Sequence, residues 1–144
     1  MKNLLLIIFL TFIFSSFTLN YVESSVEKFI TEWKGVPYKF GGNTKKGIDC
    51  SKLTQRFYKD VYNINIPEVC WKQWNYTKRI QKDSLQEGDL VFFNSKRSPS
   101  GWHVGIFLGN NLFLHAPKKH DVVKISSLDE ENYKKAYKGG GRLM

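Results

Sequence analysis

One cysteine, Cys50, stands where a Gly-rich loop passes into a helical pattern. The stretch Gly41–Tyr58 reads GGNTKKGIDCSKLTQRFY, and Leu53, Phe57 and Val61 are spaced to share one helical face. The first backbone N–H groups of a helix have no intrahelical partner, and the helix dipole is positive there, so a thiolate is favoured at that end. Because the thiolate is the reactive form, Cys50 is a candidate nucleophile. The alternative is a small buried apolar side chain, which is the usual role of a free cysteine.

Two histidines flank a predicted hairpin in the C-terminal half of the chain. His103 opens the apolar run Val104–Leu108, and His115 closes the run Leu112–Leu114. The residues between the runs, Gly109–Asn111, are typical of a tight hairpin turn. Two antiparallel strands joined this way bring both imidazoles to the same end of the hairpin.

These three residues can form a catalytic unit. Nucleophilic catalysis by a thiol needs a base to take its proton and a third group to orient the base. We expect His103 or His115 to act as the base toward Cys50 and the other histidine to hold the first ring. A single histidine on a strand is more often a structural residue, but two at one end of a tight hairpin favour the catalytic interpretation.

The order of several short motifs resembles the NlpC family of papain-like cell-wall cysteine peptidases. The matching segments are GVPYKFGG at Gly35–Gly42, DCS at Asp49–Ser51, EGDLVFF at Glu87–Phe93, HVGIFLG at His103–Gly109 and FLHA at Phe113–Ala116. Together they cover most of the chain from about Val22 onward.

The resemblance implies an enzyme that hydrolyses peptide bonds in the stem peptides of peptidoglycan, at the bond between D-γ-glutamyl and a diamino acid, without a cofactor. It implies Cys50 as nucleophile, His103 as general base and then acid, and His115 as the orienting residue. The Cys50 N–H at the helix start is a candidate oxyanion donor. Two other functions stay open: an amidase of the same chemistry, acting on the N-acetylmuramoyl-L-alanine bond or a cross-bridge, and a non-catalytic wall-binding domain.

The resemblance also implies a substrate pocket lined by Tyr38, Asp49 and Ser51. Asp49 is the candidate to meet a free amine of the substrate, but it is equally suited to cap the following helix. One position departs from the family, which usually has Gly after Asp-Cys-Ser where this chain has Lys52. A lysine in the first helical turn is expected to lie near the thiolate and to lower its pKa further or alter substrate access.

The pattern of elements predicts one α+β domain, with N-terminal helices packed on an antiparallel sheet. Helices are expected over Tyr21–Trp33, from Cys50 to about Tyr62, and over Glu68–Thr77, the last with exposed Trp71 and Trp74. Strands are expected over Leu90–Phe93, in the hairpin, and over Val122–Ile125 and Lys134–Tyr137. The polar loop Asn94–Gly101 is a candidate rim of the site, and Gly139–Gly141 is expected to loosen the C-terminal tail.

Composition and charge limit the kinds of binding partner that we expect. The chain of 144 residues carries a formal net charge of +9, which suits either a solvated basic surface or contact with an anionic cell-wall polymer. The basic residues are scattered and no nucleic-acid motif is present, so no nucleic acid is expected. Without CxxC or HExxH spacing we predict no metal. The second cysteine, Cys70, is expected to be buried or half-buried without a catalytic part.

The N-terminus predicts export. Met1–Thr18 has a basic start at Lys2 and an apolar core at Leu4–Phe14, which is the length of a signal peptide and short for a membrane span. The mature domain is then expected to comprise residues 19–144, secreted, periplasmic or associated with the cell wall. An uncleaved signal anchor is the alternative.

Overall fold

The structure, a computed structural model, describes residues 25–144. The targeting segment predicted at Met1–Thr18 lies outside these residues. The chain divides into two compact units between Glu32 and Trp33. Residues 25–33 are helical, and Val26 and Phe29 are buried on the face that their spacing predicts. Within residues 25–144 no helix combines the length and the apolar character that a membrane span requires.

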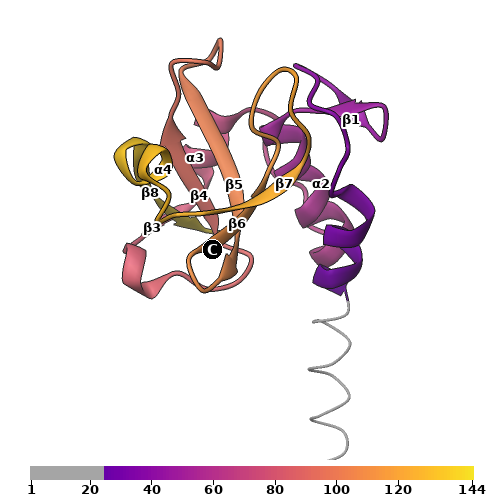
Figure 1. The fold of residues 1–144 in the computed structure, drawn as a ribbon. Coiled ribbons are helices and arrows are strands. Elements are labelled where there is room, and N and C mark those ends of the chain that lie inside the picture. The colour runs from indigo at the N-terminus through magenta and orange to yellow at the C-terminus, as the bar shows by residue number, and fades with distance from the viewer. Residues whose placement is uncertain (1–24) are drawn as a thin grey trace, which may run out of the picture. The chain divides into compact units, whose positions relative to one another are not determined.

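The second unit is organised around an antiparallel sheet in the order β3-β8-β4-β5-β6-β7 (Figure 1). Its central hairpin is the predicted one, β5 at Trp102–Gly109 followed by β6 at Leu112–His115. Asn110 and Asn111 both have positive φ, which a tight hairpin turn requires and which asparagine tolerates. The other strands are β3 at Lys78–Ile80, β4 at Leu90–Asn94, β7 at Lys124–Ser127 and β8 at Tyr137–Arg142.

Both faces of the sheet are buried. Side chains alternate along β4, so Val91 and Phe93 join Phe107, Phe113 and Leu128 in one apolar cluster. Leu90 and Phe92 point to the opposite face and are also fully buried. This burial on both sides explains why Leu90–Phe93 is a continuous apolar run rather than an alternating one.

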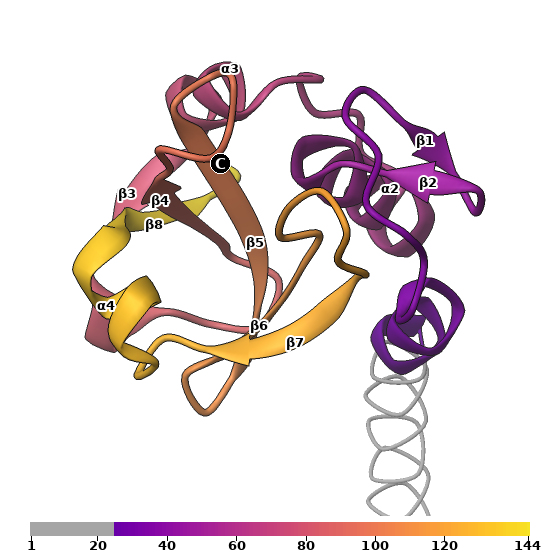
Figure 2. The ribbon, with the colours of Figure 1, turned by 45° about the horizontal axis from the view of Figure 1, so that its top comes forward.

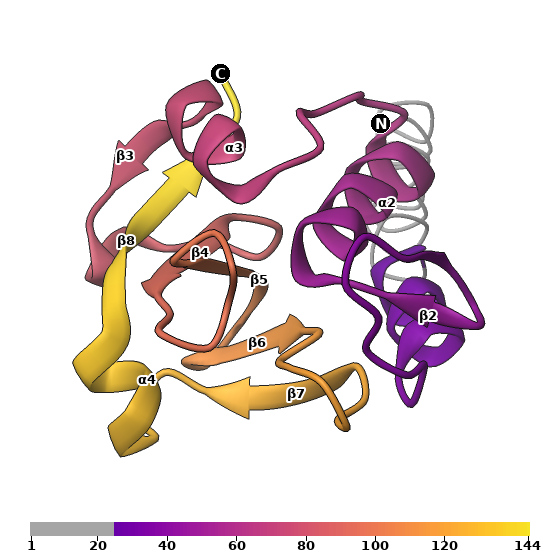
Figure 3. The same cartoon turned by 90° about the horizontal axis from the view of Figure 1, so that it is seen from above.

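Helices cover the sheet on both sides, as the view tilted by 45° and the view from above show (Figures 2 and 3). Helix α2 spans Cys50–Tyr62 and packs on β5 and β6, while α3 spans Cys70–Tyr76 and packs on β5 and α2. Helix α4, at Glu131–Ala136, packs on β4. A 3-10 turn at Lys82–Ser84 and a small hairpin of β1, Asn43–Thr44, with β2, Gly47–Ile48, complete the unit. The predicted α+β class is therefore confirmed.

The last part of the chain differs from the prediction. The first three residues of the strand expected over Lys134–Tyr137 form the second half of α4, and Tyr137 begins β8. The glycines expected to loosen the tail lie inside β8, between β3 and β4. A side chain at Gly140 or Gly141 would collide with Leu85 or Thr77. Glycine is needed here because neighbouring side chains pack closely against β8. A run of glycines in the local sequence looks the same whether it serves such packing or a flexible tail.

Two smaller predictions also change. The strand expected at Val122–Ile125 begins two residues later, as β7. Trp71 is exposed as expected, but Trp74 is half-buried, with its ring edge-on to Phe92 at 5.2 Å and near Trp102 at 5.6 Å. Trp74 therefore serves packing of α3 against the sheet.

Candidate active site

The loop before α2 fixes Cys50 at the first position of that helix. Asp49 is the N-cap, and its Oδ1 accepts hydrogen bonds from the Lys52 backbone N–H at 2.8 Å and the Ser51 hydroxyl at 3.0 Å. Its Oδ2 accepts from the backbone N–H of Gly41 at 2.9 Å, and Gly41 has a φ of 69° that glycine adopts without strain. The Gly-rich loop thus binds the capping carboxylate, and the carboxylate sets the start of α2.

Cys70 contacts Cys50, which the sequence did not predict. The two Sγ atoms are 3.6 Å apart, and the side chains are 7% and 5% exposed. The hydrogen bond from Cys70 lowers the pKa of the Cys50 thiol well below its ordinary value, and the charge and hydrogen bond of His103 lower it further, against the effect of burial. The same contact raises the pKa of Cys70, so Cys50 is the thiolate of the pair and Cys70 the donor.

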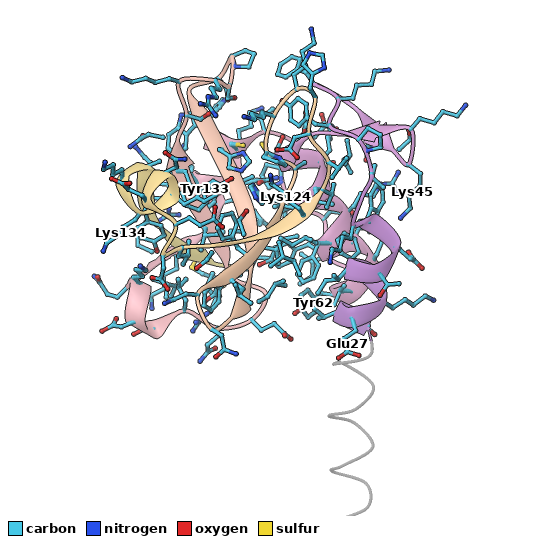
Figure 4. All side chains as sticks on the ribbon, viewed as in Figure 1. Glu27, Lys45, Tyr62, Lys124, Tyr133 and Lys134 are labelled. Carbon is cyan, nitrogen blue, oxygen red and sulfur yellow. The ribbon has the colours of Figure 1, made fainter. Side chains whose placement is uncertain are left out.

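The two histidines form a relay in the predicted hairpin. His103 Nε2 and His115 Nδ1 are 2.8 Å apart, and His115 Nε2 lies 3.0 Å from the Ser126 hydroxyl and 3.4 Å from the Tyr133 hydroxyl. Because Nε2 of His103 is engaged by His115, its Nδ1 is left for Cys50. Tyr133 comes from α4 and Lys124 from β7, and Figure 4 labels both side chains.

His115 is neutral in this setting. Burial lowers the pKa of His115 to about 2, and positive charge on His103 and Lys124 lowers it in the same direction. A neutral imidazole has one donor and one acceptor nitrogen. With Nε2–H donating to Ser126, Nδ1 accepts from His103, so His115 can orient a protonated His103.

The residues implied as substrate contacts lie near the thiol. Tyr38 is half-buried, and burial, followed by the negative charges of Cys50 and Asp49, raises its pKa to about 12. Its hydroxyl therefore remains a donor. Ser51 is buried, and its hydroxyl donates to Asp49. The side chains of Ser51 and Asp49 are therefore partners of each other at the start of α2.

Lys52, expected near the thiolate, is not among the groups that shift the pKa of Cys50. Its Nζ forms an ion pair with Glu68 Oε2 at 3.0 Å. Glu68 lies in the connection that leads into α3, so the ammonium is drawn toward that connection. The departure from the family pattern thus links the first turn of α2 to the segment before Cys70.

A pocket of about 260 Å³ adjoins His103 on the side formed by the loops after β4 and β6 and by α4. Asn94, Ser95 and Arg97 contribute to it, which agrees with the prediction that Asn94–Gly101 forms a rim. Both signs of charge line it: Arg97, Lys118 and Lys124 are basic, and Asp121 and Glu130 are acidic. The pocket reaches His103 but not Cys50.

Three residues of this arrangement had no signal in the sequence analysis. The sequence favours a packing role for Cys70, Ser126 lies just past the expected strand Val122–Ile125, and Tyr133 precedes a segment expected to be a strand. Each is brought to the site by an element from another part of the chain. Only the bounds of β7 and α4 would have exposed Ser126 and Tyr133 as candidates.

A thiolate beside an imidazole that is oriented by a buried neutral residue is the arrangement of a cysteine hydrolase of the papain-like kind. Comparison with known proteins agrees in fold. The NlpC/P60 family matches residues 35–142, and the chain belongs to this family.

Several relatives carry enzymatic names. The chain is 39% identical over 123 residues to the murein DD-endopeptidase MepS/murein LD-carboxypeptidase of Escherichia coli K12, covering 85% of this chain and 64% of that protein. It is 41% identical to a probable endopeptidase of Haemophilus influenzae over 74% of this chain and 65% of the other. It is 33% identical to the gamma-DL-glutamyl hydrolase of Bacillus subtilis over 82% of this chain and 28% of the other. The chain thus spans less than two thirds of the length of these relatives.

Solved structures show the same fold. A crystal structure of an NlpC/P60 family protein from Bacillus cereus superposes with a TM-score of 0.75 at 28% identity, over 85% of this chain and 40% of the other. The NlpC/p60 domain of the peptidoglycan hydrolase SagA gives a TM-score of 0.70 at 28% identity, over 83% of this chain and 97% of that domain. The mixed arrangement of helices on an antiparallel sheet is that of the family.

Proposed function

We propose that this protein hydrolyses amide bonds in the stem peptides of peptidoglycan, with Cys50 as nucleophile, His103 as general base and acid, and His115 as the orienting residue. Two observations carry the proposal: the charge and hydrogen bond of His103 act on the Cys50 thiol, and Nε2 of His103 lies 2.8 Å from Nδ1 of His115. The lowered pKa of Cys50 supplies the thiolate, and the 2.8 Å contact between the histidines fixes the ring that accepts and returns the proton.

The mechanism follows from these contacts. The Cys50 thiolate attacks the scissile carbonyl carbon, while the protonated His103 is held by the acceptor nitrogen of His115. His103 then gives its proton to the leaving amine, and an acyl-thioester remains on Cys50. His103, now neutral, takes a proton from water, and the resulting hydroxide releases the product acid.

The oxyanion of the tetrahedral intermediate needs preorganised donors. The backbone N–H of Cys50 is one candidate, because the first N–H groups of a helix lack intrahelical acceptors. The Tyr38 hydroxyl is a second candidate, since its raised pKa of about 12 keeps it protonated beside the negative charge of Cys50.

Substrate recognition is assigned to the two sides of Cys50 and His103. We place Tyr38, Asp49 and Ser51 on the side that holds the acyl part of the substrate, where the Asp49 carboxylate attracts a free amine. The pocket beside His103 lies where the leaving amine is protonated. Its mixed charges, such as Arg97 and Glu130, suit a diamino acid that carries both a carboxylate and an amine.

Two bonds are candidates for cleavage. The resemblance to the NlpC family favours the bond between D-γ-glutamyl and the diamino acid, and the name of the Bacillus subtilis relative agrees with a γ-glutamyl bond. The cross-bridge is the second candidate, because the Escherichia coli relative at 39% identity is named a murein DD-endopeptidase. The N-acetylmuramoyl-L-alanine bond has no such support among these relatives.

The test is digestion of purified peptidoglycan by the protein and by Cys50→Ala, followed by mass spectrometry of the soluble products. New diamino-acid N-termini indicate γ-glutamyl cleavage, while conversion of cross-linked dimers to monomers indicates cleavage of the cross-bridge. Free glycan chains without peptide would instead identify the muramoyl amidase. A wall that the folded wild-type protein binds but leaves intact would refute hydrolysis and support the wall-binding alternative.

Location and attraction to the wall form a separate part of the proposal. We propose that Met1–Thr18 directs export, that residues 19–144 act outside the cytoplasm, and that their basic charge attracts anionic wall polymers. N-terminal sequencing of the mature protein tests the first point. For the second, binding to whole walls should weaken as salt rises, because surface charges are screened over about 8 Å at physiological salt, whereas cleavage of a small soluble peptide should change less. Wall binding that ignores salt would refute the electrostatic contribution.

A further inference from the structure

Cys50 and Cys70 make a direct contact of 3.6 Å between their sulfur atoms, and both thiols are free. The hydrolytic steps use Cys50 and leave Cys70 unchanged. A serine hydroxyl in place of the Cys70 thiol would also donate a hydrogen bond to the thiolate. A sulfur at this position adds one property that a hydroxyl lacks, which is the ability to form a covalent bond to an oxidised neighbour.

The contact is built into the packing of α3 on α2. Gln73, on α3 and fully buried, donates from Nε2 to the Ser51 carbonyl at 3.0 Å and to the Pro67 carbonyl at 2.8 Å. Its Oε1 accepts from the Thr54 hydroxyl at 2.9 Å. These bonds hold the start of α3 against the residue that follows Cys50, so Cys70 has little freedom to move away.

A second link lies on the surface. The ion pair between Lys52 and Glu68 joins the first turn of α2 to the segment that leads into Cys70. The sulfur atoms of a disulfide are about 2.05 Å apart, so the two thiols need to close by about 1.5 Å. A small rotation of the two side chains, with the helices in place, supplies a movement of this size.

We propose that Cys50 and Cys70 form a peroxide-sensitive redox pair, in which oxidation converts the nucleophile to a reversible disulfide. In the first step the Cys50 thiolate attacks one oxygen of a hydroperoxide. The O–O bond breaks, the sulfur becomes a sulfenic acid, and the peroxide is reduced to water or an alcohol after taking up a proton.

In the second step the Cys70 sulfur attacks the Cys50 sulfur. The S–S bond forms as the S–O bond breaks, and the hydroxyl leaves as water with the proton of the Cys70 thiol. A dithiol reductant reverses the change by thiol–disulfide exchange and is itself oxidised to a disulfide. The disulfide removes the nucleophile and also protects Cys50 from irreversible oxidation to sulfinic and sulfonic acids.

The inhibitory consequence rests on the proposed function, but the covalent step does not. The experiment therefore begins with peptide mapping, which reads the disulfide without any activity. The full chain is reduced and then treated with hydrogen peroxide. It is next denatured in the presence of iodoacetamide, which blocks the free thiols, and digested with trypsin. The expected product is Gly47–Lys52 joined to Asp60–Lys72, and it should separate into the two peptides on treatment with dithiothreitol.

Cys70→Ser serves as the matched variant, because it keeps a donor beside Cys50 but cannot form the disulfide. After the same peroxide treatment its Cys50 peptide should carry sulfinic or sulfonic acid. In parallel, cleavage activity of each protein is measured relative to its own untreated rate. Wild type should lose activity and regain most of it with dithiothreitol, whereas the variant should lose activity without recovery.

Several results would overturn the proposal. Wild-type protein that yields over-oxidised Cys50 with alkylated Cys70 would show that the pair does not resolve the sulfenic acid. A disulfide found only between two copies of the chain would do the same. If the intramolecular disulfide forms but no peptidoglycan is cleaved under any condition, the redox pair stands and the proposed hydrolytic function fails.

Discussion

The thiol side and the imidazole side of the candidate site are assembled differently. His103 and His115 lie on neighbouring strands of one hairpin, and the turn between them fixes their approach. Cys50 and Cys70 begin two separate helices, and their approach depends on how α3 packs on α2 through the buried Gln73. The comparison teaches that the relay follows from local pairing, whereas the environment of the nucleophile follows from packing between helices.

The largest effect is expected on the imidazole side, from loss of the base. We predict that His103→Ala lowers kcat/KM by about 10²–10⁴-fold, the usual contribution of a positioned acid–base group. The measurement is steady-state cleavage of a soluble stem peptide. The control is His120→Asn, since His120 is exposed in a turn with a φ of 67° that asparagine tolerates. If His120→Asn lowered kcat/KM as much as His103→Ala, the assignment of the catalytic histidines to the hairpin would be wrong.

The orienting residue should matter less than the base. His115→Ala removes a hydrogen bond to a charged group, which contributes about 1.5–3 kcal/mol and corresponds to about a 10-fold to 100-fold loss in kcat/KM. His115→Asn should retain more activity because its amide oxygen can accept from His103. Since the pKa of His115 is lowered to about 2, neither variant should remove an ionisation near neutral pH. A pH–rate profile whose inflection near neutrality disappears in His115→Asn would show that His115 itself titrates there.

On the thiol side the expected effect is a shift in pH dependence. The hydrogen bond from Cys70 lowers the pKa of Cys50, so Cys70→Ala should raise that pKa toward its ordinary value of about 8.5. At pH values below the raised pKa, less thiolate is present and iodoacetamide should alkylate Cys50 more slowly than in wild type. At high pH, where both proteins are ionised, the rates should converge. If the alkylation rates of Cys70→Ala and wild type had the same pH profile, Cys70 would not be what lowers the pKa of Cys50.

The smallest effect is expected from the surface link between the helices. Lys52 and Glu68 form a partly exposed ion pair, and such pairs contribute about 0–1 kcal/mol. Lys52→Ala should therefore lower the free energy of unfolding by less than about 1 kcal/mol in urea titrations. Gln73→Ala removes a fully buried side chain and its hydrogen bonds to the Thr54 hydroxyl and to the Ser51 and Pro67 carbonyls, so it should cost more. If the order of the two losses were reversed, the surface pair rather than Gln73 would hold α3 in place.

Much of the fold was accessible from local pattern. The bounds of α2 at Cys50 and Tyr62 agree with the prediction, because the Asp49 cap and the apolar spacing act within one segment. The same holds for β4 and for the hairpin of β5 and β6, whose turn residues specify its geometry. The C-terminal segment was predicted wrongly, because Gly139–Gly141 lies in a strand whose need for glycine comes from Leu85 and Thr77 far away in the chain.

The sequence by itself determined the family resemblance, the helix that begins at Cys50 and the hairpin that pairs His103 with His115, because each depends on residues close together in the chain. Only the tertiary structure decided what surrounds them. Ser126 and Tyr133 reach His115 from β7 and α4, and Cys70 reaches Cys50 from α3. These contacts join residues from separate elements. The pKa values of Cys50 and His115 are therefore set by burial and by neighbours that no local sequence pattern records.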